Sequence, residues 1–122
     1  MSSSQPARAP SSSSDRRQRR YPRFCAEFPV AVLLFSGSQY QTLEGYCKDL
    51  SEAGIGLLVA FELSVKEVVS LKFRLPNTKE DWEVSAVLRY RRGYHFGFEF
   101  LSLPEKQRKF LREYVRQLPR AD

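Results

Sequence analysis

The chain has 122 residues, of which 42% are hydrophobic and 28% are charged, a composition typical of a single globular domain. Its longest apolar run, Val30 to Phe35, is far shorter than the roughly 20 residues of a membrane-spanning helix, so none is expected. The net charge of +6 is concentrated at the start, because residues 1–23 carry six arginines and one aspartate, whereas residues 24–122 carry 14 basic and 13 acidic side chains. This asymmetry favours an anionic partner.

Residues 1–15 are rich in serine, proline and alanine and show no apolar periodicity, so a disordered tail is expected. They also lack the basic and then apolar layout of a secretory signal, which predicts a cytoplasmic location. In that compartment Cys25 and Cys47 are expected to be reduced thiols.

Residues 16–23 form an arginine-rich arm. Within it, Pro22 fixes its own backbone angle and favours an extended conformation at Tyr21. Arginines on an extended arm can pair with phosphates, bind the edge of guanine or stack on a purine. A basic, solubilising tail is the alternative interpretation of the arm.

From Phe24 onward, apolar and polar residues alternate in short runs, which predicts a mainly β domain. Six strands are expected, over residues 24–35, 40–48, 55–61, 69–75, 82–91 and 94–100. The last two strands flank Arg92-Gly93 and are predicted to form a hairpin. Six strands with short connections favour an antiparallel barrel or sandwich.

An amphipathic helix is predicted over residues 103–118, because apolar residues recur there at helical spacing. The sequence Ser102-Leu103-Pro104-Glu105 predicts a capping box at its start. The helix is expected to end before Pro119, to pack its apolar stripe on the strands, and to leave residues 119–122 as a short tail.

The chemistry that enzymes and metal sites need is sparse in this sequence. His95 is the only histidine and is expected to be structural or merely exposed. Cys25 and Cys47 are far apart in the chain and form no zinc motif, and no dinucleotide or Walker phosphate loop is present. A binding module without metal, cofactor or enzymatic activity is therefore predicted.

A second cluster, Asp49-Leu50-Ser51-Glu52-Ala53-Gly54, lies between two predicted strands. The Asp49 carboxylate can accept the N1–H and the exocyclic amine of a guanine, and Ser51 offers a hydroxyl. Gly54 lets a ligand approach the backbone. The same sequence is also a reasonable turn, so a purely structural role is the alternative.

In this order, the two clusters resemble the motif pair of the PilZ family, bacterial receptors for the second messenger cyclic di-GMP. The family's Arg-x-x-x-Arg motif is matched by Arg19 and Arg23. Its (Asp/Asn)-x-Ser-x-x-Gly motif is matched by Asp49, Ser51 and Gly54. The resemblance covers residues 16–118 and extends to the number of strands and the closing helix.

The resemblance implies a six-stranded antiparallel β-barrel with a C-terminal helix and cyclic di-GMP as the ligand. It also implies that Arg19 and Arg23 clamp phosphates and guanine, while Asp49 and Ser51 read the guanine edge. In the family, the residue before the first motif arginine, here Gln18, influences whether one or two ligands are bound. Further candidate contacts are Arg16, Arg17, Gln18, Arg20 and Arg89.

The resemblance therefore implies a cyclic di-GMP receptor or adaptor that signals to a downstream protein. The arm adjoins the predicted disordered tail, so it is expected to become ordered on ligand binding. One alternative is a β-barrel that binds single-stranded nucleic acid, and another is a protein adaptor that needs no ligand. The nearly neutral charge of residues 24–122 disfavours nucleic acid, because nucleic-acid surfaces usually spread positive charge over a face.

Overall fold

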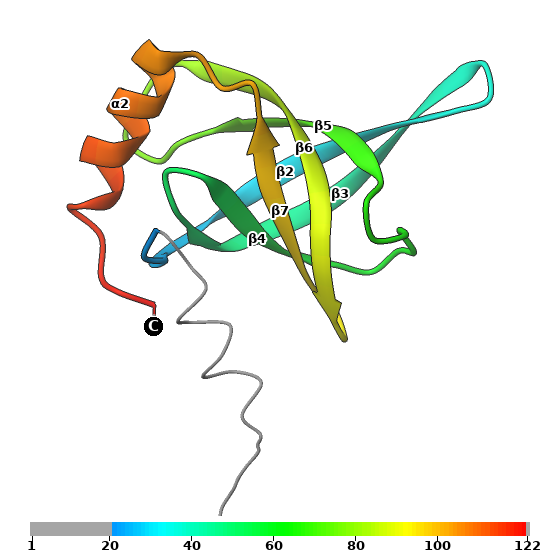
Figure 1. Ribbon diagram of the computed structural model, residues 1–122, viewed down its shortest axis with the longest axis horizontal. Helices are drawn as coiled ribbons and strands as arrows, with labels where there is room; N and C mark the ends of the chain where they lie inside the picture. The colour runs from blue at the N-terminus through cyan, green and yellow to red at the C-terminus, as the bar shows by residue number, and fades with distance from the viewer. Residues whose placement is uncertain (1–20, 122) are drawn as a thin grey trace, which may run out of the picture.

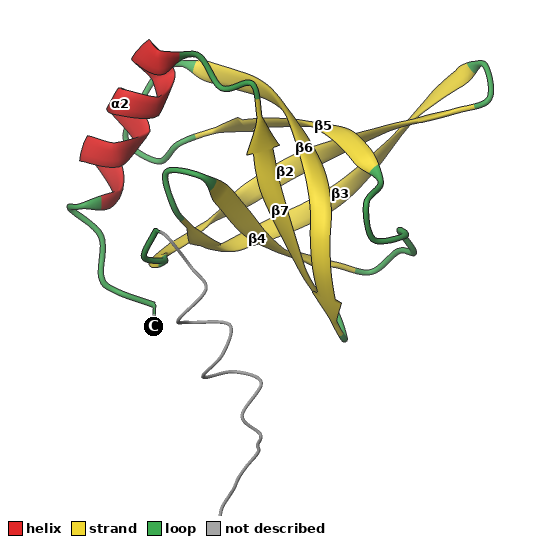
Figure 2. Ribbon diagram, in the orientation of Figure 1, coloured by secondary structure: helices red, strands yellow, loops and turns green. Residues whose placement is uncertain are grey.

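In the computed structural model, which describes residues 21–121, six antiparallel strands close into a barrel, as the sequence predicts (Figure 1). The order of strands around the barrel is β2-β3-β4-β7-β6-β5. The strands are β2 (Phe24–Ser36), β3 (Gln39–Leu50), β4 (Gly54–Val59), β5 (Val68–Arg74), β6 (Asp81–Arg92) and β7 (His95–Leu101). A single helix in this part of the chain, α2 (Glu105–Val115), follows the last strand (Figure 2).

The barrel core is filled by the side chains that the period-two alternation predicts to face inward. In β5, for example, Val69, Leu71 and Phe73 are buried, whereas Val68 and Lys72 are exposed. The largest fully buried side chains are Phe96, Phe98, Leu50, Ile55, Leu57, Leu71, Leu75, Leu88, Leu111, Val32 and Cys47. Burial of this apolar surface is the main stabilising contribution to the fold.

Helix α2 lies at the opposite end of the molecule from the tip of the β2–β3 hairpin (Figure 1). Leu111 and Val115 are buried against the core, which confirms that the apolar stripe packs on the barrel. The predicted capping box is wrong, because the N-cap residue is Pro104 and no side chain caps the helix. Ser102 has a φ of 53°, so the chain turns there before the helix begins.

The turn between β6 and β7 lies one residue later than predicted. β6 continues through Arg92, and Gly93 and Tyr94 form the turn. Gly93 has a φ of 59°, a left-handed conformation that glycine adopts without a steric penalty.

The segment after α2 pairs with the start of β2. The amide of Cys25 donates to the carbonyl of Pro119 over 2.7 Å, and the amide of Ala121 donates to the carbonyl of Arg23 over 2.9 Å. The Arg120 guanidinium lies 5.6 Å from the centre of the Phe24 ring. Residues 119–121, expected to be a tail, are thus hydrogen-bonded to residues 23 and 25, at the end of the arginine arm and the start of β2.

Several sequence-based expectations concern residues outside the described range. These are the disordered tail over residues 1–15 and the arm residues 16–20. Within residues 21–121, no helix has both the length and the apolar character needed to cross a membrane.

Candidate functional site

Arg23 and Asp49, one from each sequence cluster, form an ion pair at the edge of the barrel. The Arg23 Nη1 atom donates to Asp49 Oδ1 over 2.6 Å. Their side chains are 12% and 16% exposed, respectively, so the pair is largely withdrawn from water but still open on one side. Arg23 precedes β2 and Asp49 lies near the end of β3, whose backbone pairs with β2 at Cys25.

An irregularity in β3 brings Asp49 to the outer surface. Cys47 and Leu50 both face the core although they are three residues apart, and the pairing of β3 with β4 shifts between Cys47 and Asp49. An extra residue in one strand changes the direction of the following side chains, and such bulges often lie beside functional sites. Lys48 and Asp49 therefore both remain partly exposed.

Ser51 and Gly54 build the tight turn that joins β3 to β4. Ser51 is 3% exposed, and its hydroxyl accepts hydrogen bonds from the amides of Ala53 and Gly54 at 3.1 and 3.0 Å. A Cβ atom on Gly54 would overlap the backbone carbonyl of Phe98, so this position requires glycine. Ser51 and Gly54 therefore have the structural role in a turn that the sequence also allows. Their contacts with a ligand stay predictions.

The second oxygen of the Asp49 carboxylate contacts His95, the first residue of β7. Asp49 Oδ2 lies 3.1 Å from His95 Nε2. Burial alone would raise the pKa of Asp49, but the hydrogen bond from His95 and the charge and hydrogen bond of Arg23 outweigh it, so the pKa is lowered. The carboxylate is accordingly ionised near neutral pH and acts only as an acceptor.

The lowered pKa of Asp49 predicts a specific loss of stability in acid. A folded-state pKa below the usual value of 3.8 contributes stability above that pH, and the contribution is lost as the pH falls through the folded-state pKa. The free energy of unfolding should therefore fall less steeply below about pH 4 in Asp49→Asn than in the wild type, as measured by urea unfolding.

Asp81→Asn is the matched control for this titration. Asp81 also pairs with an arginine, but its side chain is 77% exposed, so solvent screening should make its contribution small. Identical acid slopes in the wild type and Asp49→Asn would contradict the assignment.

A second charged network lies beside the first and joins three separate segments. Arg112 Nε donates to Glu52 Oε2 over 3.0 Å, and Arg108 Nε lies 3.6 Å from the same oxygen. Arg108 also donates to the Tyr21 hydroxyl over 2.5 Å and places its guanidinium 5.3 Å from the centre of the Tyr21 ring. The end of the arm, the β3–β4 turn and helix α2 are thus directly connected.

The sequence model of the PilZ domain matches residues 17–117. The chain belongs to the PilZ domain family. Among curated proteins, none matches the chain significantly in sequence.

Solved structures similar to this PilZ domain share its fold at low sequence identity. The inhibitor of motility MotI (DgrA) of Bacillus subtilis is 19% identical with a TM-score of 0.65, over 82% of this chain and 50% of MotI. The chain thus spans about half the length of MotI. The PilZ domain of YcgR from Escherichia coli, solved with cyclic di-GMP, is 20% identical with a TM-score of 0.62, over 83% of this chain and 91% of that domain. The PilZ domain of CeSA from a cellulose-synthesizing bacterium is 22% identical with a TM-score of 0.59, over 78% of this chain and 95% of that one.

Arg89 is the one further candidate contact among the described residues, and its ion-pair partner is Glu99 rather than Asp49. Arg89 pairs with Glu99 over 2.6 Å on the outer surface, and Glu99 lies opposite Gly54 in the pairing of β4 with β7. Arg16, Arg17, Gln18, Arg19 and Arg20 lie outside the described residues.

His95 is the residue of this site that the sequence-based interpretation missed. The sequence predicts a structural or merely exposed histidine; in the structure its side chain is 29% exposed and its Nε2 atom lies 3.1 Å from the motif carboxylate, a contact that the sequence did not predict. No linear pattern of the sequence indicates this contact, because it depends on the strand register: Asp49 pairs with Gly56, and a glycine with no side chain leaves room for residues on the strands on either side.

Both cysteines of the PilZ domain are free thiols, with Cys25 exposed and Cys47 buried. Burial raises the pKa of the Cys47 thiol far above its usual range, so it stays protonated. Cys47 donates a hydrogen bond to the Asp49 carbonyl over 3.3 Å, which makes it part of the support for the strand end.

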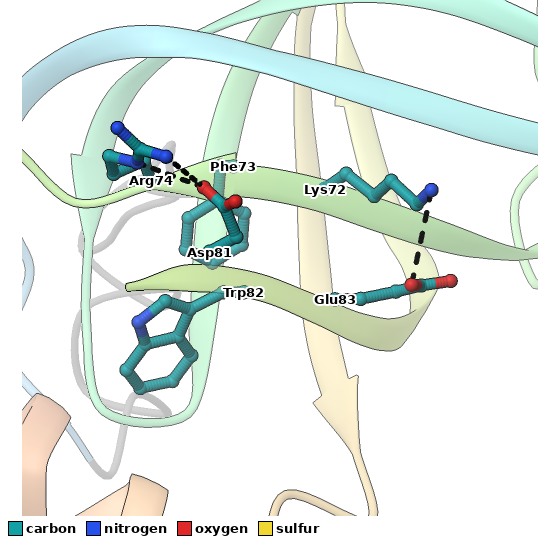
Figure 3. Close-up of a pocket in the computed structure, with 6 residues that line it drawn as sticks. All are labelled: Lys72, Phe73, Arg74, Asp81, Trp82 and Glu83. Atoms are coloured by element: carbon teal, nitrogen blue, oxygen red, sulfur yellow. Dashed lines mark hydrogen bonds and ion pairs between the residues drawn. The ribbon is translucent and has the colours of Figure 1, made fainter. Parts of the chain in front are cut away.

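A hollow on the β5–β6 hairpin provides a contrasting charged surface (Figure 3). It is lined by Lys72, Phe73, Arg74, Asp81, Trp82 and Glu83. Arg74 pairs with Asp81 at 2.9 Å and Lys72 with Glu83 at 4.0 Å, so both cations already have carboxylate partners. No excess of positive charge is available in the hollow for an anionic ligand.

Proposed function

We propose that this PilZ domain is a receptor for cyclic di-GMP and signals through a protein partner. The observation that carries the proposal is the Arg23–Asp49 ion pair, since it joins the two motifs, 26 residues apart, at one partly open edge of the barrel. The cyclic di-GMP bound to the PilZ domain of YcgR supports the same ligand here.

In this proposal, each motif supplies a different chemistry. Arg19 and Arg23 bind the phosphates and a guanine through their guanidinium groups, which suit both. Asp49 accepts the donor edge of a guanine, and Ser51 and Gly54 hold the turn and keep the backbone close to the ligand. Further contacts from the arm are proposed for Arg16, Arg17, Gln18 and Arg20, and Arg89 is a candidate contact from the barrel.

The relay to a partner is proposed to run from the arm to helix α2 and the C-terminal segment. The Tyr21 hydroxyl accepts a hydrogen bond from Arg108 of the helix, and the Arg23 carbonyl accepts one from the amide of Ala121. Tyr21 and Arg23 belong to the arm itself. When the arm folds over the ligand, their contacts with Arg108 and Ala121 therefore change. The surface that α2 offers to a downstream protein then differs between the free and bound states.

Amide hydrogen exchange with and without cyclic di-GMP tests this relay. We expect the ligand to alter exchange in the arm, the β3–β4 turn and α2 together, and we expect Arg108→Ala to remove the response of α2 while binding persists. Lys109→Ala, an exposed position on the same helix, is the control and should respond as the wild type does. A response confined to the arm and the turn would show a receptor without this relay.

A further inference from the structure

The Asp49 carboxylate is held from two sides, and only one of the two partners belongs to the proposed ligand-binding arm. Arg23 holds Oδ1 and is itself expected to turn toward the ligand. His95 holds Oδ2 from strand β7, within the body of the barrel. We propose that His95 is a positioning residue that fixes the Asp49 carboxylate for guanine recognition, an inference that rests on the proposed function.

The direction of the hydrogen bond follows from the chemistry of the two groups. An ionised carboxylate can only accept a hydrogen bond, so the hydrogen in this contact is on His95 Nε2, and the Nε2–H group donates a hydrogen bond to Oδ2 over 3.1 Å. A carboxylate has about four lone-pair sites, so the His95 and Arg23 bonds leave acceptor capacity for the N1–H and amine of guanine. His95 therefore orients Asp49 without blocking it.

A glycine on the intervening strand makes the contact between Asp49 and His95 possible. Strand β4 lies between β3 and β7, and Gly56 pairs with Asp49 on one side and with Gly97 on the other. A Cβ atom on Gly56 would lie 2.6 and 2.7 Å from the two Asp49 carboxylate oxygens and 2.8 Å from His95 Nε2. The two side chains thus meet directly above a residue that has no side chain.

The His95 ring is supported in turn by Tyr90. The two rings stack with their centres 5.7 Å apart and an angle of 29° between their planes. Tyr90 lies close over Gly97, where a Cβ atom would overlap the Tyr90 ring. Arg92 places its guanidinium 5.4 Å from the centre of the same ring. Gly56 thus makes room for His95 and Asp49, and Gly97 makes room for Tyr90. The side chains form a connected row, in the order Arg92, Tyr90, His95 and Asp49.

This row explains why the carboxylate keeps its orientation when Arg23 engages the ligand. Recognition of the guanine edge needs the acceptor oxygens in a fixed plane, and a partly exposed aspartate with no fixed partner would have to lose side-chain freedom on binding. His95, stacked on Tyr90, supplies that partner before the ligand arrives.

Calorimetric titration of the full chain with cyclic di-GMP and with its inosine analogue, which lacks the exocyclic amine, tests the role of His95. His95→Phe keeps a ring over Tyr90 but removes the donor, and His95→Gln restores a donor at a similar reach. We expect His95→Phe to bind cyclic di-GMP about tenfold more weakly and to discriminate less between guanine and inosine. We expect His95→Gln to recover most of both properties.

Three results would overturn the positioning role. These are wild-type affinity in His95→Phe, an equal loss for both ligands with unchanged discrimination, and a His95→Gln protein as weak as His95→Phe. Thermal unfolding of each variant separates loss of fold from loss of positioning. A wild-type protein that binds no cyclic di-GMP would instead overturn the proposed function itself.

Discussion

Arg23→Ala is expected to weaken the binding of cyclic di-GMP by more than about tenfold, because a charge-assisted contact contributes about 1.5–3 kcal/mol. The barrel should remain folded, since Arg23 precedes the first strand and His95 still pairs with Asp49. Arg19→Ala is expected to act in the same way through the other motif arginine. Calorimetry gives the affinities, and thermal unfolding confirms that the variants are folded.

Arg74→Ala is the matched control, because Arg74 is also paired with a carboxylate, at 2.9 Å, and its loss changes the net charge equally. It lies in the hollow on the β5–β6 hairpin, where it plays no part in the proposed site (Figure 3). An equal loss of affinity in Arg74→Ala would show that the effect of Arg23→Ala comes from the change in net charge. An unchanged affinity in Arg23→Ala would show that cyclic di-GMP does not bind at Arg23.

Asp49→Ala is expected to weaken cyclic di-GMP binding, although it removes a negative charge from a site that is proposed to bind phosphates. A carboxylate near phosphates is electrostatically unfavourable, so its loss would strengthen an indiscriminate phosphate binder. If Asp49 pairs with the donor edge of guanine, its removal leaves those donors unmatched and costs about 1–3 kcal/mol. The sign of the change therefore separates the two modes of binding.

The ion pair with Arg23 offers an indirect route to the same loss, because Asp49 also orients that arginine. The inosine analogue of the ligand distinguishes the two routes. The wild type should bind this analogue more weakly than cyclic di-GMP, whereas Asp49→Ala should scarcely discriminate between them. Stronger binding of cyclic di-GMP by Asp49→Ala would count directly against guanine recognition at this position.

The strands were predictable because their information is local, whereas their closure into a barrel rather than a sandwich was implied only by the family resemblance. Alternation along each strand identifies the inward side chains, and all six strands lie within a few residues of their predicted bounds. The errors lie at chain turns: Ser102 leaves the helix uncapped, and the β6–β7 turn uses Gly93 and Tyr94. At each of these turns, one residue with a positive φ reverses the chain, and the sequence does not show which of several neighbouring residues adopts it.

Of the candidate site, only the residues that belong to the two linear motifs could be predicted from the sequence. The contact between Arg23 and Asp49 joins two such residues. His95 escaped because its contact with Asp49 depends on the register of three strands and on the missing side chain of Gly56. The hydrogen bond of Arg108 to Tyr21 and its ion pair with Glu52 likewise depend on where α2 packs. Helical periodicity alone does not specify that position.

The most direct test of the account is calorimetric titration of the full chain with cyclic di-GMP, with GMP and with a single-stranded oligonucleotide. The arm and the Asp49 cluster are proposed to act on one ligand at once, and only cyclic di-GMP offers them two guanines and two phosphates in a closed ring. The account predicts tight binding of cyclic di-GMP and weak binding of the other two. Equal affinity for cyclic di-GMP and GMP, or tighter binding of the oligonucleotide, would contradict it.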